Sequence, residues 1–370
     1  MDVDYAIVGG GPAGLGVAIE ATLAGARAVV VDRCRGPIDK ACGEGLMPPG
    51  VARLRAMGVV PPAWGTHVFT GIRYVDGDVV AEGTFPEGPG LGVRRLALSE
   101  ALRARAAALG VTLFDGTEAT GWRQDTDGVT LETSRGPVRA RWLVAADGLH
   151  SRVRKEAGIA ATPLRTEGRR LGVRRHFTVA PWSDKVEVWW ADGAEAYVTP
   201  VGPERVGVAF LWSGGKGDHD ALLARFPALA AKLGPAESQA RGAGPFGVHV
   251  AERVRGRVLL VGDAAGYLDA LTGEGLSLAW ESGAALVKRT LANDAAGYAR
   301  DWAHITRRHL LFTGLLLQVA RRPWLRHRVV RALRRFPGGF DAFLGLNTGF
   351  YSPLRALPSL GTVGIGLLTG

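Results

Sequence analysis

Apolar and polar positions over the first forty residues follow two different periods. A continuous apolar run, YAIV, ends at the glycines of GGGPAG, and Leu15, Ala18, Ile19 and Leu23 then follow with helical spacing. A second apolar run, AVVVD, ends at Asp32. Continuous apolar runs of this length are typical of buried strands, and the intervening spacing is typical of a helix. The pattern therefore predicts a strand, a helix and a second strand of an α/β fold.

The same design recurs at two later places in the chain. RWLVAADG, residues 141–148, is an apolar strand pattern that ends in an Asp-Gly turn before a basic helix. GRVLLVGD, residues 256–263, ends in a Gly-Asp turn, and a loop with two further glycines leads into a long helical pattern. Three separated strands are thus each expected to end in a turn built from glycine or aspartate.

Residues 163–215 have a different character. Short apolar runs are broken by DG and GP turns, and Val206, Val208, Phe210 and Trp212 alternate along one stretch. Strict alternation of this kind predicts an antiparallel sheet, here with an aromatic face. The stretch HVFTGIRYVDGDVVAEG, within residues 66–90, is expected to add strands to it.

From about residue 300 the pattern becomes helical to the end of the chain. The apolar stretch HLLFTGLLLQVA is about a dozen residues long, which is shorter than the roughly 20 needed to span a bilayer. It can be a buried helix or an interfacial anchor. The tail after Phe336 is rich in Gly, Pro and Leu and is expected to cover a substrate tunnel.

Composition and charge narrow the class of protein. The 370 residues are 47% hydrophobic and 22% charged, which is ordinary for a soluble globular chain large enough for two domains. The net charge is +10, but residues 305–336 hold nine arginines and no acidic residue, so the rest of the chain carries about +1. This distribution argues against nucleic acid as a partner. The basic stretch is interpreted as a solvated helix face or as a peripheral contact with an anionic membrane.

The cysteines and the N-terminus bear on metal binding and on location. Cys34 and Cys42 lie eight residues apart without the histidine companions of a metal site, so neither a metal nor a disulfide framework is expected. The N-terminus runs directly into a strand without the pattern of a signal peptide. We therefore expect a cytoplasmic protein, which could also associate with a membrane through residues 305–336. No pattern indicates an oligomeric state.

The first glycine turn matches a dinucleotide-binding fingerprint. Gly9, Gly11 and Gly14 fit G-x-G-x-x-G, in which the first glycine makes the tight turn, the second admits a pyrophosphate and the third packs helix on strand. The helix N-terminus would face the phosphates with free amides. Asp32 follows Gly14 by 18 residues and ends the second strand, where a carboxylate can accept the ribose hydroxyls. This motif alone does not separate NAD from FAD.

Three motifs together are more specific. The glycine fingerprint, ADGLHSRVR and VGDAAGYLDALTGEG, in this order, resemble the FAD-dependent superfamily of aromatic hydroxylases, geranylgeranyl reductases and flavin-dependent halogenases. The resemblance spans roughly residues 1–290. It implies a Rossmann-like FAD-binding domain, an antiparallel substrate-binding sheet and a C-terminal helical region. The implied boundaries are 1–65, 92–162 and 252–300 for the first, 66–91 and 163–251 for the second, and 301–370 for the third.

The resemblance also implies a set of cofactor-binding residues. Asp263 would bind the ribityl chain or pyrophosphate, and the amides at Gly275 and Leu276 would open a helix toward the pyrimidine side of the flavin, where they stabilise its reduced form. Arg95, with Arg94 as its rival, would contact the phosphates. The full set is Gly9, Gly11, Ala13, Gly14, Asp32, Arg33, Cys42, Gly43, Arg95, Ala119, Asp147, Gly262, Asp263, Gly273, Gly275 and Leu276.

The loop DKACGEGLMPPG, residues 39–50, is expected to line the active site. Gly43 and Gly45 permit a close approach of backbone to the flavin. Cys42 is a candidate proton donor or redox thiol, with apolar packing as the alternative. Glu44 is a candidate for substrate orientation or proton transfer, with loop capping as the alternative. Across the cavity, the candidate walls of a substrate pocket, for which core packing is the alternative, are Trp190, Tyr197, Phe210 and Trp212.

The FAD motifs leave the reaction open between two chemistries. The first expectation is an NAD(P)H-dependent monooxygenase that hydroxylates a hydrophobic phenolic or polyketide-like substrate through a flavin C4a-hydroperoxide, with NAD(P)H visiting transiently. The alternative is geranylgeranyl-reductase-like reduction of C=C bonds in a prenyl or polyene substrate, toward which the motifs GDAAG and LTGEG lean. A halogenase is less expected, because W-x-W-x-I-P is absent. A flavin-binding protein without catalytic activity is the remaining alternative.

Overall fold

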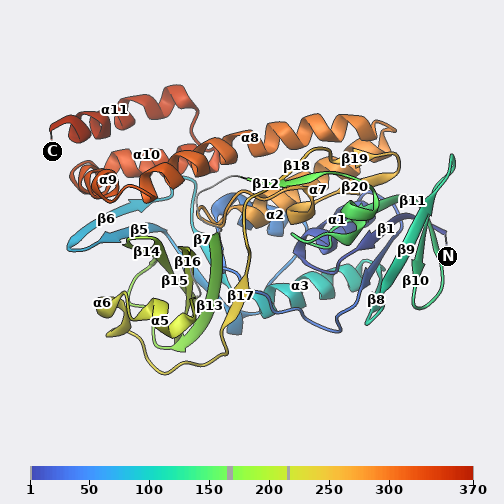
Figure 1. Cartoon of the computed structure of the whole chain (residues 1–370), viewed down its shortest axis with the longest axis horizontal. Coiled ribbons are helices and arrows are strands. Elements are labelled where there is room, and N and C mark those ends of the chain that lie inside the picture. Colours follow the sequence, from blue (N-terminus) through green and yellow to red (C-terminus); the bar gives the residue numbers. More distant parts are fainter. Residues whose placement is uncertain (1, 165–169, 215–216, 370) are drawn as a thin grey trace.

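The structure, a computed structural model, describes residues 2–164, 170–214 and 217–369. Residues 165–169 and 215–216 of the expected substrate-binding segment lie outside the described residues. The chain forms two large sheets and a group of C-terminal helices (Figure 1). This arrangement confirms the predicted α/β fold with a Rossmann-like part, a second sheet and a helical end.

The first sheet has eight strands. They are β1 (Asp2–Val8), β2 (Ala28–Asp32), β8 (Thr112–Asp115), β9 (Ala119–Gln124), β10 (Val129–Thr133), β11 (Val138–Ala145), β19 (Val254–Arg255) and β20 (Val258–Leu260). The parallel strands lie in the order β8, β2, β1, β11, β20, so the three strands with glycine or aspartate turns are neighbours. Strands β9 and β10 extend β11 as an antiparallel meander.

Hydrophobic packing on both faces explains why the strands of this sheet are continuous apolar runs. Tyr5 and Ile7 of β1 belong to one core cluster with the first helix, whereas Ala6 and Val8 belong to a second cluster. Such two-sided burial is typical of parallel sheets. The helices packed around this sheet are α1 (Pro12–Leu23), α2 (Pro48–Ala56), α3 (Arg95–Ala108), α4 (Arg152–Glu156) and α7 (Gly275–Leu291).

The second sheet has seven strands. In spatial order they are β17 (Arg241–Ala243), β13 (Arg170–Thr178), β16 (Arg205–Ser213), β15 (Ala194–Gly202), β14 (Lys185–Ala191), β5 (Gly71–Asp76) and β6 (Val79–Thr84). Neighbours are antiparallel, as the alternation predicts, except that β5 and β14 pair in parallel. A parallel pair needs a long crossover, and residues 77–184 provide one.

Two small sheets connect the larger ones. β4 (Thr66–Phe69) pairs with β7 (Gly90–Val93) and does not join the second sheet, so residues 66–90 contribute only β5 and β6 to that sheet. β7 also pairs with β3 (Gly45–Leu46), the end of the loop that begins at Asp39. β12 (Ala161–Pro163) pairs with β18 (Val248–Val250). The loop 39–45 is thereby anchored between the two large sheets.

Helices cover both faces of the second sheet. Tyr74 packs against Phe340 of the C-terminal helices on one face, and Phe210 packs against Phe226 on the other. The remaining helices are η1 (Ala63–Gly65), α5 (His219–Leu223), α6 (Pro227–Ala230), η2 (Gly262–Ala265), α8 (Ala295–Ala320), α9 (Pro323–Arg335), α10 (Pro337–Thr348) and α11 (Pro353–Thr369).

Candidate active site

The turn between β1 and α1 can be built only from glycine at two positions. Gly9 has a φ of 112°, and a Cβ there would lie 2.3 Å from the carbonyl oxygen of Ala146. A Cβ on Gly14 would lie 1.9 Å from the carbonyl oxygen of Gly9. Gly11, in contrast, faces open space, with nothing within 4 Å of an added Cβ. The turn therefore packs α1 tightly on β1 and leaves the helix N-terminus free to approach a phosphate.

A cavity of about 860 Å³ opens at the carboxyl ends of the parallel strands, and most of the expected site residues line it. This edge of a parallel sheet is where ligands bind in doubly wound folds. Residues from all three glycine and aspartate turns meet there. The expected residues that line the cavity are Gly11, Ala13, Arg33, Cys42, Gly43, Glu44, Arg95, Asp147, Tyr197, Phe210, Gly262, Asp263, Gly273, Gly275 and Leu276.

Six of the expected residues lie elsewhere. Gly9 and Gly14 support the turn from behind, and Asp32 accepts hydrogen bonds from the amides of Gly10 at 2.6 Å and Cys34 at 2.7 Å. The carbonyl of Ala119 accepts a hydrogen bond from Arg152. The other two, Trp190 and Trp212, belong to hydrophobic clusters on the second sheet and are not among the residues that line the cavity.

Several polar groups at the cavity lack a partner within the described residues. The Nε of Arg95 is buried without a hydrogen bond, and so is Oδ1 of Asp147, whose Oδ2 caps α4 by accepting the amides of Arg152 and Val153. Asp263 lines the cavity with an exposed side chain, and the partial desolvation caused by the cavity wall raises the pKa of its carboxyl above the usual value. Buried polar groups are normally satisfied, so unpartnered ones around a cavity indicate a bound polar ligand.

The N-terminus of α7 is a second open helix end at the cavity. Gly273 turns the chain with a φ of 69°, and Gly275 and Leu276 start the helix against the cavity wall. No side chain of the described structure caps this end. Free amides and the positive end of the helix dipole there favour an anionic group, so α1 and α7 present two such ends to one cavity.

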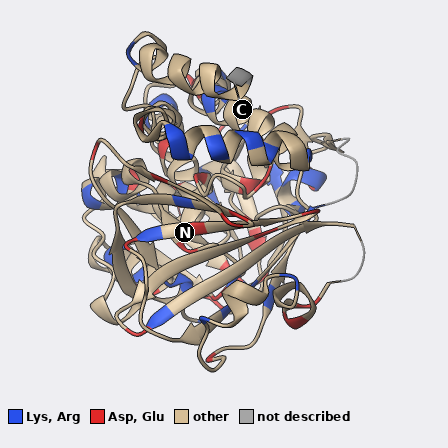
Figure 2. Ribbon diagram, turned by 90° about the vertical axis from the view of Figure 1, so that its left-hand side faces the viewer, with Lys and Arg blue, Asp and Glu red and all other residues tan. Residues whose placement is uncertain are grey.

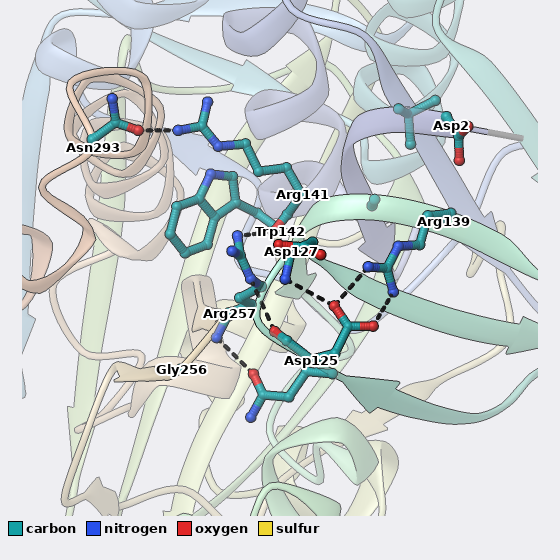
Figure 3. A pocket seen from close by; sticks show the side chains of 12 residues that line it. Asp2, Asp125, Asp127, Arg139, Arg141, Trp142, Gly256, Arg257 and Asn293 are labelled. Carbon is teal, nitrogen blue, oxygen red and sulfur yellow. Dashed lines mark hydrogen bonds and ion pairs between the residues drawn. The ribbon is translucent and has the colours of Figure 1, made fainter.

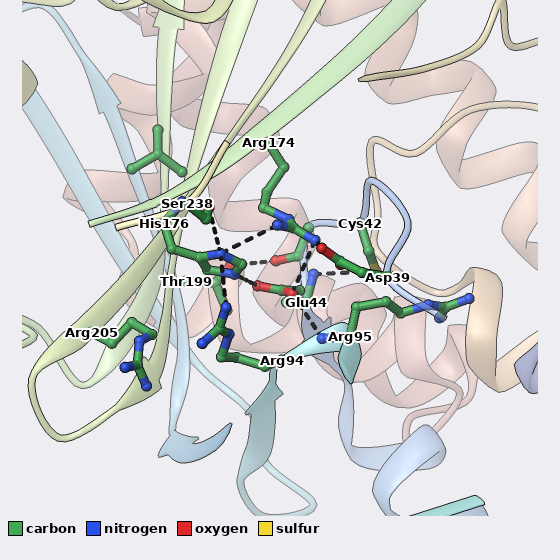
Figure 4. A network of polar contacts seen from close by, with 12 residues as sticks. Asp39, Cys42, Glu44, Arg94, Arg95, Arg174, His176, Thr199, Arg205 and Ser238 are labelled. Carbon is green, nitrogen blue, oxygen red and sulfur yellow. Dashed lines mark hydrogen bonds and ion pairs between the residues drawn. The ribbon is translucent and has the colours of Figure 1, made fainter. Parts of the chain in front are cut away.

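The carboxylate of Glu44 is closed into a network of polar contacts (Figure 4). Its Oε2 lies 2.6 Å from Nε2 of His176, and its Oε1 accepts the amide of Arg95 at 2.8 Å. Arg174 lies 3.6 Å from the same carboxylate and also binds Asp39 at 2.5 Å. The side chain of Glu44 is only 1% exposed. The expected catalytic candidate is therefore held in an ion-paired network between the loop and β13.

This network fixes the conformation of the loop. Glu44 has a positive φ of 61°, which is uncommon for a residue other than glycine and needs support from its surroundings. Thr199 of β15 donates a hydrogen bond to the carbonyl of Gly43 at 2.7 Å. Cys42, which accepts the amide of Glu44 at 3.4 Å, is partly exposed beside the cavity. The loop thus presents its backbone and one thiol to the cavity while its carboxylate points into the protein.

Beyond the loop, the cavity continues between the second sheet and the C-terminal helices. Apolar and aromatic side chains from the sheet and from α8 and α10 form this part of its wall. They are Ile72, Tyr74, Val186, Val188, Leu316, Phe343 and Leu344. One cavity therefore joins an open, polar cradle at the first sheet to an apolar chamber under the helices.

A second hollow lies at the opposite, amino ends of the parallel strands (Figure 3). It has a volume of about 810 Å³, and its charged residues largely bind one another. Arg139 forms a two-point contact with Asp125 at 2.7 Å, and Arg257 donates to a backbone carbonyl. Because its three arginines, Arg139, Arg141 and Arg257, are paired with the protein, this hollow gives no indication of an anionic ligand.

Some side chains of the basic C-terminal segment are buried in ion pairs, whereas others are exposed. Lys and Arg recur along the helices near the C-terminus (Figure 2). Arg326 is buried, where it pairs with Asp76 at 3.1 Å and Asp192 at 3.2 Å and so joins α9 to the second sheet. Leu311, Leu315 and other apolar side chains of α8 and α9 are exposed. Within the described ranges, no helix is long and apolar enough to cross a membrane.

The cradle has the groups that FAD needs. Two open helix ends suit the pyrophosphate and the pyrimidine edge, the unpartnered Arg95 suits a phosphate, and Asp263 suits hydroxyl donors of the ribityl chain. The fold and the cavity thus define an FAD-dependent oxidoreductase. The sequence matches the FAD binding domain family over residues 2–309, and the chain belongs to this family.

The relatives include a reductase and a monooxygenase. The chain is 27% identical to digeranylgeranylglycerophospholipid reductase 2 of Methanosphaera stadtmanae over 311 residues, which are 76% of each chain. It is 30% identical to 12-dehydrotetracycline 5-monooxygenase/anhydrotetracycline 6-monooxygenase of Streptomyces rimosus over 321 residues, which are 76% of this chain and 61% of that one. A flavoprotein/dehydrogenase from Cytophaga hutchinsonii shares the fold, with a TM-score of 0.82, 18% identity and coverage of 100% and 99%.

Some residues at the cavity could not be expected from motifs. Arg174, His176 and Thr199 hold the loop, and Tyr267 and Asn347 line the cavity. The first two belong to the stretch GVRRHF, where charged residues occupy buried strand positions. That pattern is the one sequence signal for a buried polar network, since a strand in an apolar sheet buries charge only with a partner.

Proposed function

We propose that this protein is an NAD(P)H-dependent FAD monooxygenase that hydroxylates a hydrophobic, phenolic or polyketide-like molecule. The observation that carries the proposal is the single cavity that joins the polar cradle to the apolar chamber. A substrate in the chamber would lie beside the flavin in a space lined by Tyr74, Phe343 and other apolar groups, which would help to exclude water once substrate is bound. The monooxygenase relative supports the same reaction type.

The chain contributes binding, orientation and electrostatics, whereas bound FAD supplies the oxidation chemistry itself. Arg95 and the N-terminus of α1 would hold the phosphates, and Asp263 the ribityl hydroxyls. The amides at the start of α7 would stabilise negative charge at the pyrimidine edge. The network around Glu44 holds loop 39–45 in place at the cavity, where its backbone would meet the flavin, and Cys42 lines the same cavity with a thiol.

Reduction of a C=C bond in a prenyl or polyene substrate is the second candidate. Two observations favour it: the reductase relative matches 76% of its own length, and the Cys42 thiol at the cavity could donate the proton that follows hydride transfer. In this reaction the substrate gains two hydrogens and no oxygen. The two candidates therefore differ in the atoms added to the product.

Turnover of the flavin-loaded protein with NADPH or NADH separates the candidates. We would supply a panel of phenols and prenyl alcohols and measure oxygen uptake together with the product mass. The proposal predicts oxygen consumption and a gain of one oxygen atom. Anaerobic turnover with a gain of two hydrogens would establish the reductase instead, and failure of every donor to reduce the flavin would contradict both.

A further inference from the structure

A polar group lies where the cavity meets α8 and α10, and the carboxyl groups of Glu87 and Glu281 lie near enough to interact with it. Thr272, from the loop before α7, and Asn347, from α10, line the cavity. Behind them Glu274 and His309 are 7% exposed each, and Asn347 is 8% exposed. Polar side chains at such depth require partners. Their hydrogen bonds show which atoms are satisfied by the protein and which are left for a ligand.

The orientation of the Asn347 amide is fixed by its neighbour. Its Nδ2 donates to Oε1 of Glu274 at 2.9 Å, and a carboxylate can accept but not donate in its ionised form. The amide oxygen must therefore point away from Glu274. This Oδ1 is buried and has no hydrogen-bond partner among the residues that the structure describes. Asn347, a residue of the cavity wall, thus carries a buried and unpaired acceptor.

The other members of the group hold this arrangement in place. Nδ1 of His309 lies 3.5 Å from Oε2 of Glu274 and 3.2 Å from the hydroxyl of Thr272. Thr313 lies 3.4 Å from the same ring nitrogen. Glu274 is therefore engaged from two sides, by Asn347 and by His309. Glu274 and His309 act as positioning residues, because they set where the Asn347 oxygen and the Thr272 hydroxyl can point.

We propose that Asn347 Oδ1 and Thr272 Oγ1 form a recognition site for a hydroxyl group of the substrate, held in place by Glu274 and His309. This inference rests on the proposed function, since it assigns the ligand of the same cavity. A hydroxyl donates the hydrogen bond that Oδ1 lacks, whereas a hydrocarbon would leave that oxygen buried and unpaired. A site that hydrogen-bonds a hydroxyl therefore discriminates against analogues without one, by about the free energy of one hydrogen bond.

Two probes that differ by one hydroxyl test the site. We would titrate the FAD-loaded protein with 2-naphthol and with naphthalene and follow the flavin absorbance and the heat of binding. The hydroxyl makes transfer out of water less favourable, so hydrophobic burial alone favours naphthalene. We expect 2-naphthol to bind about three- to tenfold more tightly, the range for one hydrogen bond. Equal affinities, tighter binding of naphthalene, or no binding of either probe would overturn the proposal.

Variants locate the preference within the cavity. Asn347→Leu should abolish the preference for 2-naphthol, and Thr272→Val should reduce it, while FAD affinity stays unchanged. Leu316→Ala, the control, removes apolar contact and should weaken both probes alike. A folded Asn347→Leu protein that keeps the preference would overturn the proposal, and so would one that loses FAD affinity instead. If Asn347→Leu does not fold, Thr272→Val and the wild-type preference decide.

The experiment also separates this inference from the proposed monooxygenase activity. Probe binding requires only the loaded protein and no turnover. A preference for 2-naphthol in a protein that consumes no oxygen with any substrate would contradict the proposed reaction and leave the hydroxyl site standing. Oxygen-dependent turnover without a preference would do the reverse.

Discussion

Two carboxylates at the same cavity differ in what surrounds them. Glu44 is closed off, with His176, Arg174 and the amide of Arg95 around its oxygens. Asp263 is exposed at the cavity, and within the described residues its carboxylate interacts only at longer range, with Arg95 and Lys40. The closed carboxylate stabilises a loop, whereas the open one is available to a ligand. At this cavity, unsatisfied polar atoms mark the binding site more reliably than residue type does.

The largest effect on stability and flavin content is expected at the glycine turn between β1 and α1. In Gly14→Ala the new Cβ would lie 1.9 Å from a backbone oxygen, so α1 must move away from β1. Overpacking of this kind costs about 1–3 kcal/mol, and here it also displaces the helix end that faces the phosphates. We expect a lower melting temperature and loss of copurified flavin, measured by thermal unfolding and by absorbance.

A helical glycine without close neighbours provides the control. Gly314 lies in α8, with nothing within 4 Å of an added Cβ, so Gly314→Ala should leave flavin content unchanged and raise helix stability slightly. Equal flavin content in Gly14→Ala and Gly314→Ala would show that the turn is not part of the cofactor site.

Two adjacent arginines provide a sharp test, because one has an unpaired nitrogen at the cavity and the other is bound to protein groups. Arg95 lines the cavity with an unpaired Nε, whereas Arg94 reaches Glu237 at 3.4 Å and His176 at 3.5 Å. Loss of a charged hydrogen bond to phosphate costs about 1.5–3 kcal/mol, or roughly tenfold to a hundredfold in affinity. Arg95→Met should weaken FAD binding by that factor in calorimetric titration. Arg94→Met should not, and an equal loss in both variants would refute the assignment.

Replacement of the closed carboxylate should affect stability more than chemistry. Glu44→Gln keeps an acceptor for the Arg95 amide but removes the charge that pairs with His176, and we expect the free energy of unfolding to fall by about 1–3 kcal/mol. The pH profile of turnover should keep its shape. Glu252→Gln, in an exposed pair with Arg255, should change neither quantity. A lost limb of the pH profile in Glu44→Gln would make Glu44 a proton-transfer group.

Asp263 should change the pH dependence of protein stability in the opposite direction to an ordinary ion-paired aspartate. The surrounding cavity wall raises the pKa of Asp263 in the folded protein above 3.8, but the side chain is exposed to the cavity, so its charged form lowers the stability of the flavin-free protein only slightly at neutral pH. Asp263→Asn should therefore raise the melting temperature of that form. The gain should be full above the raised pKa and vanish as pH falls toward 3.8. A gain that grows on acidification would contradict this environment.

The smallest effect concerns the basic segment, 305–336, whose contact with an anionic membrane stays a prediction. Arg326 is buried in ion pairs, so the eight other arginines would provide the attraction. We expect weak cosedimentation with phosphatidylserine vesicles that disappears at high salt and with neutral vesicles. Arg334→Gln with Arg335→Gln should reduce it. Binding that is equal with neutral vesicles, or no binding to anionic ones, would remove the prediction.

The sequence could predict the glycine turn at the cavity well, because the residues that form this turn are close together in the chain. Gly9, Gly11 and Gly14 lie on one turn, and the strand, turn and helix pattern places that turn at a sheet edge. The network around Glu44, in contrast, depends on contacts between residues far apart in the chain: Glu44 and His176 are separated by 132 residues. Nothing in either local pattern specifies that contact. The orientations of Trp190 and Trp212 were likewise unpredictable, because alternation assigns a face but not which parts of that face line a cavity.

The central claim is that three turns meet to bind one FAD. Its most direct test is calorimetric titration of flavin-free protein with FAD, with AMP and riboflavin as partial ligands. The account predicts one FAD per chain, a yellow complex, and much weaker binding of either part alone, because the two helix ends and Arg95 act together. A protein that stays colourless and takes up no FAD, or that binds riboflavin as tightly as FAD, would contradict it.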